Sequence, residues 1–375
     1  MKTRFLFFAA LLTAMAIMPA SDATAQSANN NHRQDRPRQQ RRERPAPRFD
    51  SGLAVIPGTT FDIKGRDFHQ GDKIVFAYAD KSWQPFVLET TMKGDTAVSV
   101  VIPQSMKSGN FILTRMRGRS FRQLGRARIN IVKTMPASAQ VIAHRGFWAT
   151  QGSTQNSRAS LRKALELNIY GSETDVWLTP DGHLMANHDR EFKGHVIMNT
   201  PADSCRMLTL ANGEKMPELT EFLDILKDSD SPTKLIIEIK DHGDEARNRA
   251  AATAAVKAVK KAGVQDKVEY ISFSDDACNQ IATDDPHAKV AALTGGIAPA
   301  ERKKIGCTGI DYHINEFRKH PEWVKEARQL GMTVNVWTVN KPDEMAEMTN
   351  LGVQFITTDR PIDAVRVKNY YDSHR

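Results

Sequence analysis

The pattern of hydrophobic and polar positions changes at about residue 135. From about Asp50 to Lys133, short apolar and β-branched runs such as DKIVFAYAD and NFILTRMRG alternate with glycine-containing turns. From about Gln140 onward, strand-like runs alternate with helical patterns. Closely spaced short strands are typical of a β-sandwich, whereas strands that alternate with helices are typical of a parallel sheet. The pattern therefore predicts a small all-β domain over 50–135 and an α/β domain over 140–375.

The α/β half contains nine strand candidates. They are QVIAHRG, YGSETDVWLT, HLMANHD, KLIIEIK, VEYISFS, KVAALTG, GIDYHI, TVNVWTVN and VQFITTDRP. Helical patterns lie between most of them, for example over 157–167, 219–227, 244–262, 321–330 and 342–351. The last three are followed by Gly263, Gly331 and Gly352, as helix C-termini often are. This number of strands over this length fits a (β/α)₈ barrel better than an open sheet.

The all-β half carries no cluster of His, Cys or carboxylate residues of a catalytic kind. Its four clearest strand patterns are DKIVFAYAD, TAVSVVIP, NFILTRMRG and RARINIVK. The segment loosely resembles an immunoglobulin-like accessory domain. We therefore expect a spacer or docking module, whose partner the sequence does not identify.

The first 25 residues have the pattern of a signal peptide. Lys2 and Arg4 precede an apolar run over 5–18, and the small residues Ala23 to Ala25 precede Gln26. The run is shorter than the about 20 residues that a membrane span needs. We expect cleavage near Ala25/Gln26 and export of the protein, to the periplasm or beyond.

Residues 26–49 are rich in Arg, Gln and Pro and offer little to bury, so we expect a disordered linker. Seven arginines against two acidic residues place +5 of the chain's net charge of +8 here. The rest of the chain is close to neutral, which argues against nucleic acid as the main partner. The linker could still make weak contacts with an anionic surface through charge alone.

The cysteines Cys205, Cys278 and Cys307 are an odd number without metal-like spacing. In an exported protein one pair could form a disulfide. We favour buried free thiols.

Several acidic residues occupy strand positions that are otherwise apolar. Glu173 and Asp175 are two apart on one strand and therefore share a face. Adjacent carboxylates repel each other unless a cation or a proton lies between them, and hard oxygen ligands suit Ca²⁺ or Mg²⁺. Glu238, in the strand KLIIEIK, is a third candidate ligand. In a barrel, residues at the carboxyl ends of the strands form the active site.

Two histidines are placed to join this cluster. His144 and Arg145 end the first strand of the α/β half. A hairpin centred between Pro180 and Asp181 would bring His188 opposite Glu173. Two imidazoles can exchange the roles of base and acid, while a metal with Arg145 and Lys240 matches the charge of a pentavalent phosphorus. The pattern predicts phosphodiester cleavage without a protein nucleophile.

At these residues the chain resembles the glycerophosphodiester phosphodiesterase family. The shared motifs run over about 141–361: HRG at 144–146, ETDVWLTPDGHLMANHD at 173–189, EIK at 238–240, VWTVN at 336–340 and TDRP at 358–361. The resemblance implies a (β/α)₈ TIM barrel of the phospholipase-C-like phosphodiesterase type. It further implies glycerophosphodiester hydrolysis to glycerol 3-phosphate and an alcohol, through a cyclic phosphate formed by the substrate's own hydroxyl.

The resemblance also implies roles for individual residues. Glu173, Asp175 and Glu238 would hold one divalent cation, Ca²⁺ or Mg²⁺; His144 and His188 would be the acid–base pair; Arg145, Lys240, Asn156 and Trp337 would bind the small phosphodiester substrate. One departure from the family pattern matters. After HRG the family usually has Pro-Glu-Asn-Thr, and this chain has TQNS at 154–157, so Gln155 stands where the family has Glu. The motifs therefore support the class of reaction more strongly than the identity of the substrate.

Two other interpretations remain open from the sequence. One is a phospholipase, or a phosphodiesterase for another headgroup or a sugar, on the same fold. The other is a binding protein that has lost catalysis, which Gln155 and the β-rich half would support.

Overall fold

The computed structural model describes residues 52–94 and 96–375. The predicted signal peptide and the Arg-rich linker lie outside the described residues. Within the two described ranges, no helix is both long enough and apolar enough to cross a membrane. Cys205, Cys278 and Cys307 all lie in these ranges, and each is a buried free thiol.

Between residues 54 and 131, the described residues form strands joined by turns, in two sheets with a shared core. In β2, Phe61 and Ile63 are buried while Thr60, Asp62 and Lys64 are exposed, so the strand presents one face to the core. Phe76 and Phe111 meet edge to face in that core, with ring centroids 5.9 Å apart. One sheet has the order β1-β8-β7-β3-β4 and the other β2-β6-β5. The strands are β1 (Ala54–Val55), β2 (Thr60–Lys64), β3 (Lys73–Tyr78), β4 (Phe86–Glu89), β5 (Thr91–Met92), β6 (Ala97–Val101), β7 (Gly109–Arg117) and β8 (Ser120–Ile131).

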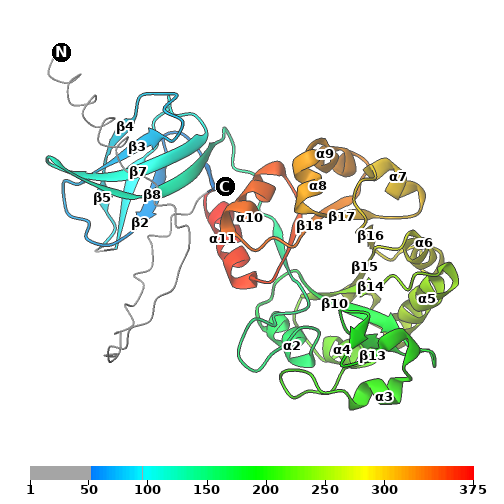
Figure 1. The fold of residues 1–375 in the computed structure, drawn as a ribbon. Helices are drawn as coiled ribbons and strands as arrows, with labels where there is room; N and C mark the ends of the chain where they lie inside the picture. Colours follow the sequence, from blue (N-terminus) through cyan, green and yellow to red (C-terminus); the bar gives the residue numbers. More distant parts are fainter. Residues whose placement is uncertain (1–51, 95) are drawn as a thin grey trace, which may run out of the picture. The chain divides into compact units, whose positions relative to one another are not determined.

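The α/β half is a closed barrel in which, within the described residues, eight parallel strands pair in a ring (Figure 1). All nine strand candidates from the sequence are strands. Near its start β10 pairs with β9, which closes the ring, and near its end it pairs with the antiparallel β11. The ring order is β9 (Gln140–Ala143), β10 (Gly171–Leu178), β14 (Lys234–Ile239), β15 (Val268–Ser272), β16 (Val290–Ala292), β17 (Gly309–His313), β18 (Thr333–Trp337) and β19 (Phe355–Thr358); β11 is Leu184–Ala186.

Helices cover the outside of this ring; α5, α6 and α9, for example, lie outside β14 to β18 in Figure 1. Their starts follow local capping: the Ser157 side chain accepts a hydrogen bond from the backbone N–H of Ser160, and Asp244 caps α5 in the same way. The helices are α2 (Arg158–Glu166), α3 (Ala202–Met207), α4 (Leu219–Lys227), α5 (Glu245–Ala262), α6 (Asp275–Asp284), α7 (Pro299–Lys304), α8 (Ile314–Lys319), α9 (Glu322–Gln329), α10 (Pro342–Leu351) and α11 (Pro361–Ser373).

The alternation along each strand separates an outer core from an inner one. In β14, Leu235 and Ile237 pack into the core between strands and helices. Ile236 belongs instead to a separate interior cluster with Ile142, Ile271 and Leu293. Glu238 continues the interior series two positions after Ile236, so its carboxylate points into the barrel near the carboxyl ends of the strands.

The hairpin between β10 and β11 differs by one residue from the predicted register. Val176 pairs with Ala186 and Leu178 with Leu184, so the hairpin is centred on Asp181 rather than between Pro180 and Asp181. The backbone N–H of Thr179 donates to the carbonyl of His183 across a three-residue loop, and Gly182 takes the left-handed conformation that this loop length needs. The predicted cross-strand pairing of His188 with Glu173 is therefore wrong.

Candidate active site

A cavity of about 260 Å³ opens at the carboxyl ends of the barrel strands. It contains seven of the nine residues that the sequence singled out, namely His144, Arg145, Glu173, His188, Glu238, Lys240 and Trp337. The remaining lining residues are Ile271, Phe273, Leu293, Asp311, Thr338 and Thr357. His188 reaches the cavity because β11 ends at Ala186 and the chain turns there, so the position of the side chain does not follow the strand register.

Three carboxylates meet on the β10–β14 side of the cavity. Glu173, Asp175 and Glu238 each offer an oxygen, and these oxygens lie within 4.8 Å of one another. All three side chains are buried. The Nζ atom of Lys240 lies 2.7 Å from Glu238 Oε1 and 3.2 Å from Asp175 Oδ1, so one cation on this chain contacts two of the three carboxylates.

The electrostatics of this cluster fit a bound divalent cation. Burial, together with the charges of Asp175 and Glu238, raises the pKa of Glu173 well above its ordinary value. Burial and the charge of Asp175 raise the pKa of Glu238 to about 8. The Oε1 atom of Glu173 has no hydrogen-bond partner among the described residues. Three hard oxygen donors, one of them unpartnered, are the ligands that Mg²⁺ and Ca²⁺ prefer.

The turn after β9 explains the HRG motif. Arg145 has a φ of +55°, and in this conformation its backbone N–H donates to Glu173 Oε2 at 2.6 Å. Gly146 has a φ of +79°, and a Cβ atom at this position would lie 2.3 Å from Ser160 Oγ. Only glycine fits this close approach of the turn to α2. The motif therefore sets both the backbone that anchors Glu173 and the direction of the Arg145 side chain.

Gln155, the departure from the family pattern, contacts Arg145 directly. Arg145 donates from its Nη1 atom to Gln155 Oε1 at 2.7 Å, while its Nε atom lies 3.7 Å from Asp175 Oδ2. A neutral amide here holds the guanidinium without neutralising it. With a glutamate at this position, Arg145 would contact one more carboxylate than it does here.

Asn156 lies behind the carboxylates and not among the residues that line the cavity. Its Nδ2 atom donates to Asp175 Oδ2 at 2.8 Å, and its Oδ1 atom accepts from the backbone N–H of Asp175 at 3.1 Å and from Thr174 Oγ1. This geometry orients Asp175, whereas the sequence predicted contact with substrate.

His144 is held by Asp359, a residue of the TDRP motif at the end of the last strand to which the sequence assigned no role. His144 Nδ1 lies 2.8 Å from Asp359 Oδ1, which also accepts from Trp148 Nε1 at 3.1 Å, and Asn340 donates to Asp359 Oδ2 at 2.8 Å. Because an ionised carboxylate only accepts, the His144 proton lies on Nδ1 and the Nε2 lone pair is left for chemistry. Burial alone would raise the pKa of Asp359, but the His144 hydrogen bond and charge, with Asn340 and Trp148, lower it to about 2.

His188 has a similar but more exposed partner. Its Nδ1 atom lies 2.7 Å from Asp189 Oδ1, and the Asp189 side chain is 79% exposed. Burial lowers the pKa of His188, which the nearby charge of Asp175 partly offsets. Both imidazoles are thus oriented through Nδ1 by a carboxylate.

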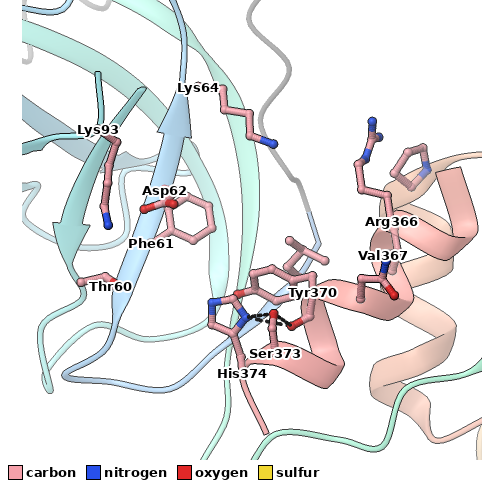
Figure 2. A pocket seen from close by; sticks show the side chains of 13 residues that line it. Thr60, Phe61, Asp62, Lys64, Lys93, Arg366, Val367, Tyr370, Ser373 and His374 are labelled. Atoms are coloured by element: carbon pink, nitrogen blue, oxygen red, sulfur yellow. Dashed lines mark hydrogen bonds between the residues drawn. The ribbon is translucent and has the colours of Figure 1, made fainter. Parts of the chain in front are cut away.

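A second, larger cavity lies elsewhere, between β2 and α11 (Figure 2). It has a volume of about 490 Å³, and Asp62, Lys64, Lys93, Arg366 and His374 are among its charged or titratable lining residues. Asp62 accepts a hydrogen bond from Ser99, and His374 bonds to the backbone carbonyl of Tyr370. Among the described residues this cavity has no carboxylate cluster, and its chemistry does not resemble that of the barrel site.

Comparisons with known proteins agree with this geometry. The model of the glycerophosphoryl diester phosphodiesterase family matches residues 144–363. The chain is 26% identical to a glycerophosphodiester phosphodiesterase of Caldanaerobacter subterraneus subsp. tengcongensis, over 59% of this chain and 94% of that protein.

Two solved structures extend the comparison. A glycerophosphodiester phosphodiesterase from Parabacteroides distasonis is 43% identical, with a TM-score of 0.62 over 63% of this chain and 99% of that one. An Oleispira antarctica phosphodiesterase in complex with the product sn-glycerol-3-phosphate shares the fold at 22% identity, with a TM-score of 0.56 over 62% of this chain and 97% of that one. The chain therefore belongs to the glycerophosphoryl diester phosphodiesterase family, a family of phosphoric diester hydrolases.

Proposed function

We propose that this protein hydrolyses glycerophosphodiesters to glycerol 3-phosphate and an alcohol in the barrel cavity, with one divalent cation. The observation that carries this proposal is the meeting of three buried carboxylates with two imidazoles, each oriented through Nδ1 by an aspartate. Among the described residues that line the cavity, no Ser, Cys or Thr is hydrogen-bonded to His144 or His188. Acid–base chemistry on the substrate's own hydroxyl fits this set better than a covalent protein intermediate.

The residues of this chain would act as follows. One imidazole takes the proton of the glycerol hydroxyl next to the phosphate, and that oxygen attacks phosphorus. The second imidazole gives a proton to the departing alcohol oxygen, which leaves a cyclic phosphate. Water then opens the ring while the two imidazoles exchange roles. His144 and His188 are the pair, because both line the cavity and both keep Nε2 available.

The charged residues of the cavity would bind the phosphate and the metal ion. Arg145 and Lys240 face the phosphate and stabilise the extra negative charge of the pentavalent transition state. Glu173, Asp175 and Glu238 would hold Ca²⁺ or Mg²⁺, which would lower the pKa of the attacking hydroxyl. Asn156 keeps Asp175 in place, and Trp337 offers an apolar wall to the substrate.

An activity screen tests this proposal. The purified protein is incubated with bis(p-nitrophenyl) phosphate and with a panel of glycerophosphodiesters, in Ca²⁺, in Mg²⁺ and in chelator. We expect turnover that requires a divalent cation. The absence of metal-dependent turnover on every substrate would refute the proposed activity.

We also propose that the protein is exported and that residues 50–135 are an immunoglobulin-like accessory domain. The support for export is the pattern of residues 1–25, with its basic start, apolar run and small residues before Gln26. The support for the domain is a pair of sheets around one aromatic core. Sequencing the N-terminus of the mature protein would test the cleavage site.

A further inference from the structure

The half of the cavity opposite the carboxylate cluster has a different chemistry. In the ring order β17 is four strands from β10 in both directions, so the two strands face each other across the barrel. The apolar lining residues towards β17 are Phe273, Leu293 and Trp337, while Ile271 lies on β15 next to Glu238. Thr338 and Thr357 also line the cavity. In this apolar half stands one acidic residue, Asp311 of β17.

Asp311 is buried and incompletely partnered. It is 2% exposed, and its Oδ1 atom has no hydrogen-bond partner among the described residues. The neighbouring amide of Asn335 is largely engaged elsewhere, since its Nδ2 atom donates to Thr357 Oγ1 at 2.8 Å. Burial raises the pKa of Asp311 to about 7, against a smaller lowering by Asn335. A buried carboxyl with a free oxygen is costly to keep unless a function or a ligand uses it.

The basic side chains that line the cavity already contact the carboxylate cluster. Among the described residues that line the cavity, Arg145 and Lys240 are the only Arg or Lys, and both contact Asp175. The imidazoles of His144 and His188 are paired with their own aspartates. Among the described residues that line this cavity, no Arg or Lys is therefore left to pair with Asp311, and a cation that does so would come with the ligand.

We propose that this half of the cavity is a subsite for a cationic amino alcohol, the leaving group of the diester, with Asp311 as its specificity-determining residue. The inference rests on the proposed function, because it places the leaving alcohol opposite the metal ligands. An ammonium or trimethylammonium group bound next to Asp311 would supply the positive counter-charge that this carboxyl lacks. A neutral polyol such as glycerol would leave that carboxyl without a counter-charge.

The aromatic walls agree with this choice. Trp337 and Phe273 meet edge to face, with ring centroids 5.7 Å apart and planes at 83°. Trp337 is fixed by its Nε1 atom, which donates to the backbone carbonyl of Asp311 at 2.8 Å. A rigid indole next to a carboxyl combines a π face with a negative charge, and both attract a quaternary or primary ammonium group.

Substrate competition tests the subsite. We compare kcat/KM for glycerophosphocholine and glycerophosphoethanolamine with that for glycerophosphoglycerol, whose leaving alcohol is neutral. The wild-type ratio of cationic to neutral substrate should be at least about tenfold, and Asp311→Asn should bring it close to one. The control is Asp276→Asn, which removes the charge of an acidic side chain on α6 that is paired with Arg249 and lies outside the cavity lining, and it should keep the wild-type ratio.

A binding measurement separates this inference from the activity itself. In chelator, choline and ethanolamine should raise the melting temperature of the wild type, or quench its tryptophan fluorescence, more than glycerol does, and Asp311→Asn should lose this difference. Turnover with no preference for cationic substrates, and no choline binding that depends on Asp311, would overturn the subsite and leave the activity standing. Choline binding without any turnover would support the subsite and refute the proposed activity.

Discussion

The two cavities of this molecule differ more in how their charged groups are paired than in volume. The cavity between β2 and α11 is the larger, at about 490 Å³ against about 260 Å³. Two of its charged groups have local partners: Arg366 pairs with Asp363, and Asp62 accepts from Ser99. The barrel cavity holds buried carboxylates that repel one another and an unpartnered oxygen on Glu173.

The difference shows what marks a reactive site in this fold. Exposed charges in an open cavity are screened by water and cost little, whereas buried like charges raise the free energy of the empty site. The barrel keeps this unfavourable arrangement at the carboxyl ends of its strands, where a cation and a phosphate can relieve it. Four predictions sharpen the contrast between the two cavities.

The largest effect is expected from removing an imidazole of the barrel cavity. His144→Ala should lower kcat/KM by about 10³–10⁴-fold, because the variant loses a general acid–base group. The circular dichroism spectrum should stay that of the wild type. His287→Ala is the matched control, since this exposed histidine lies outside both cavities. Near-normal activity of His144→Ala would remove this residue from the mechanism.

The next effect concerns the metal ligands. Glu238→Gln should weaken Mg²⁺ or Ca²⁺ binding, measured by calorimetry, by at least about 100-fold, since even groups next to metal ligands change affinity by about 10–100-fold. Saturating cation should raise the melting temperature of the wild type and have little effect on that of the variant. An equal rise in both proteins would show that Glu238 is not a ligand.

A smaller effect is expected in the pH dependence of stability at Asp359. Its pKa falls from 3.8 to about 2 on folding, so its contribution, about 2 kcal/mol, is present above about pH 5 and is lost as the pH falls towards 2. Urea unfolding of the wild type and of Asp359→Asn should therefore differ at pH 7 and converge in acid. A difference that stays constant with pH would contradict the assigned hydrogen bond between Asp359 and His144.

The smallest effect is expected in the larger cavity. Lys93→Ala and Arg366→Ala remove positive charges that line it (Figure 2). Because these side chains are remote from the barrel carboxylates, kcat/KM should stay within about twofold of the wild type, as for most surface changes. A tenfold loss in either variant would mean that the two cavities are coupled.

The sequence predicted the barrel well because its signals are local. Strands with continuous apolar character, and carboxylates two positions apart on them, can be recognised without tertiary contacts. The identities of Glu173, Asp175 and Glu238 as neighbours followed from strand parity and from the rule that strand ends converge.

The remaining features depend on geometry that the sequence does not encode locally. The register of β11 depended on a three-residue loop, so the predicted pairing of His188 was off by one residue. Asn156 turned towards Asp175 because its backbone is left-handed, with a φ of +53°. Asp359 follows β19, which pairs with β9 beside His144, whereas Asp311 lies on β17, across the barrel from β10. Both are far in sequence from the residues they face, and only the ring of strands brings them into the site.

The reaction that we propose for the barrel cavity converts a glycerophosphodiester into glycerol 3-phosphate and an alcohol. The most direct test is a ³¹P NMR time course of the purified protein with glycerophosphocholine, run in Mg²⁺ or Ca²⁺ and in chelator. We expect the diester signal to be replaced by that of glycerol 3-phosphate, with a cyclic phosphate at most transient, and we expect chelator to stop the change. An unchanged diester signal in both metals, or the release of phosphocholine instead, would contradict it.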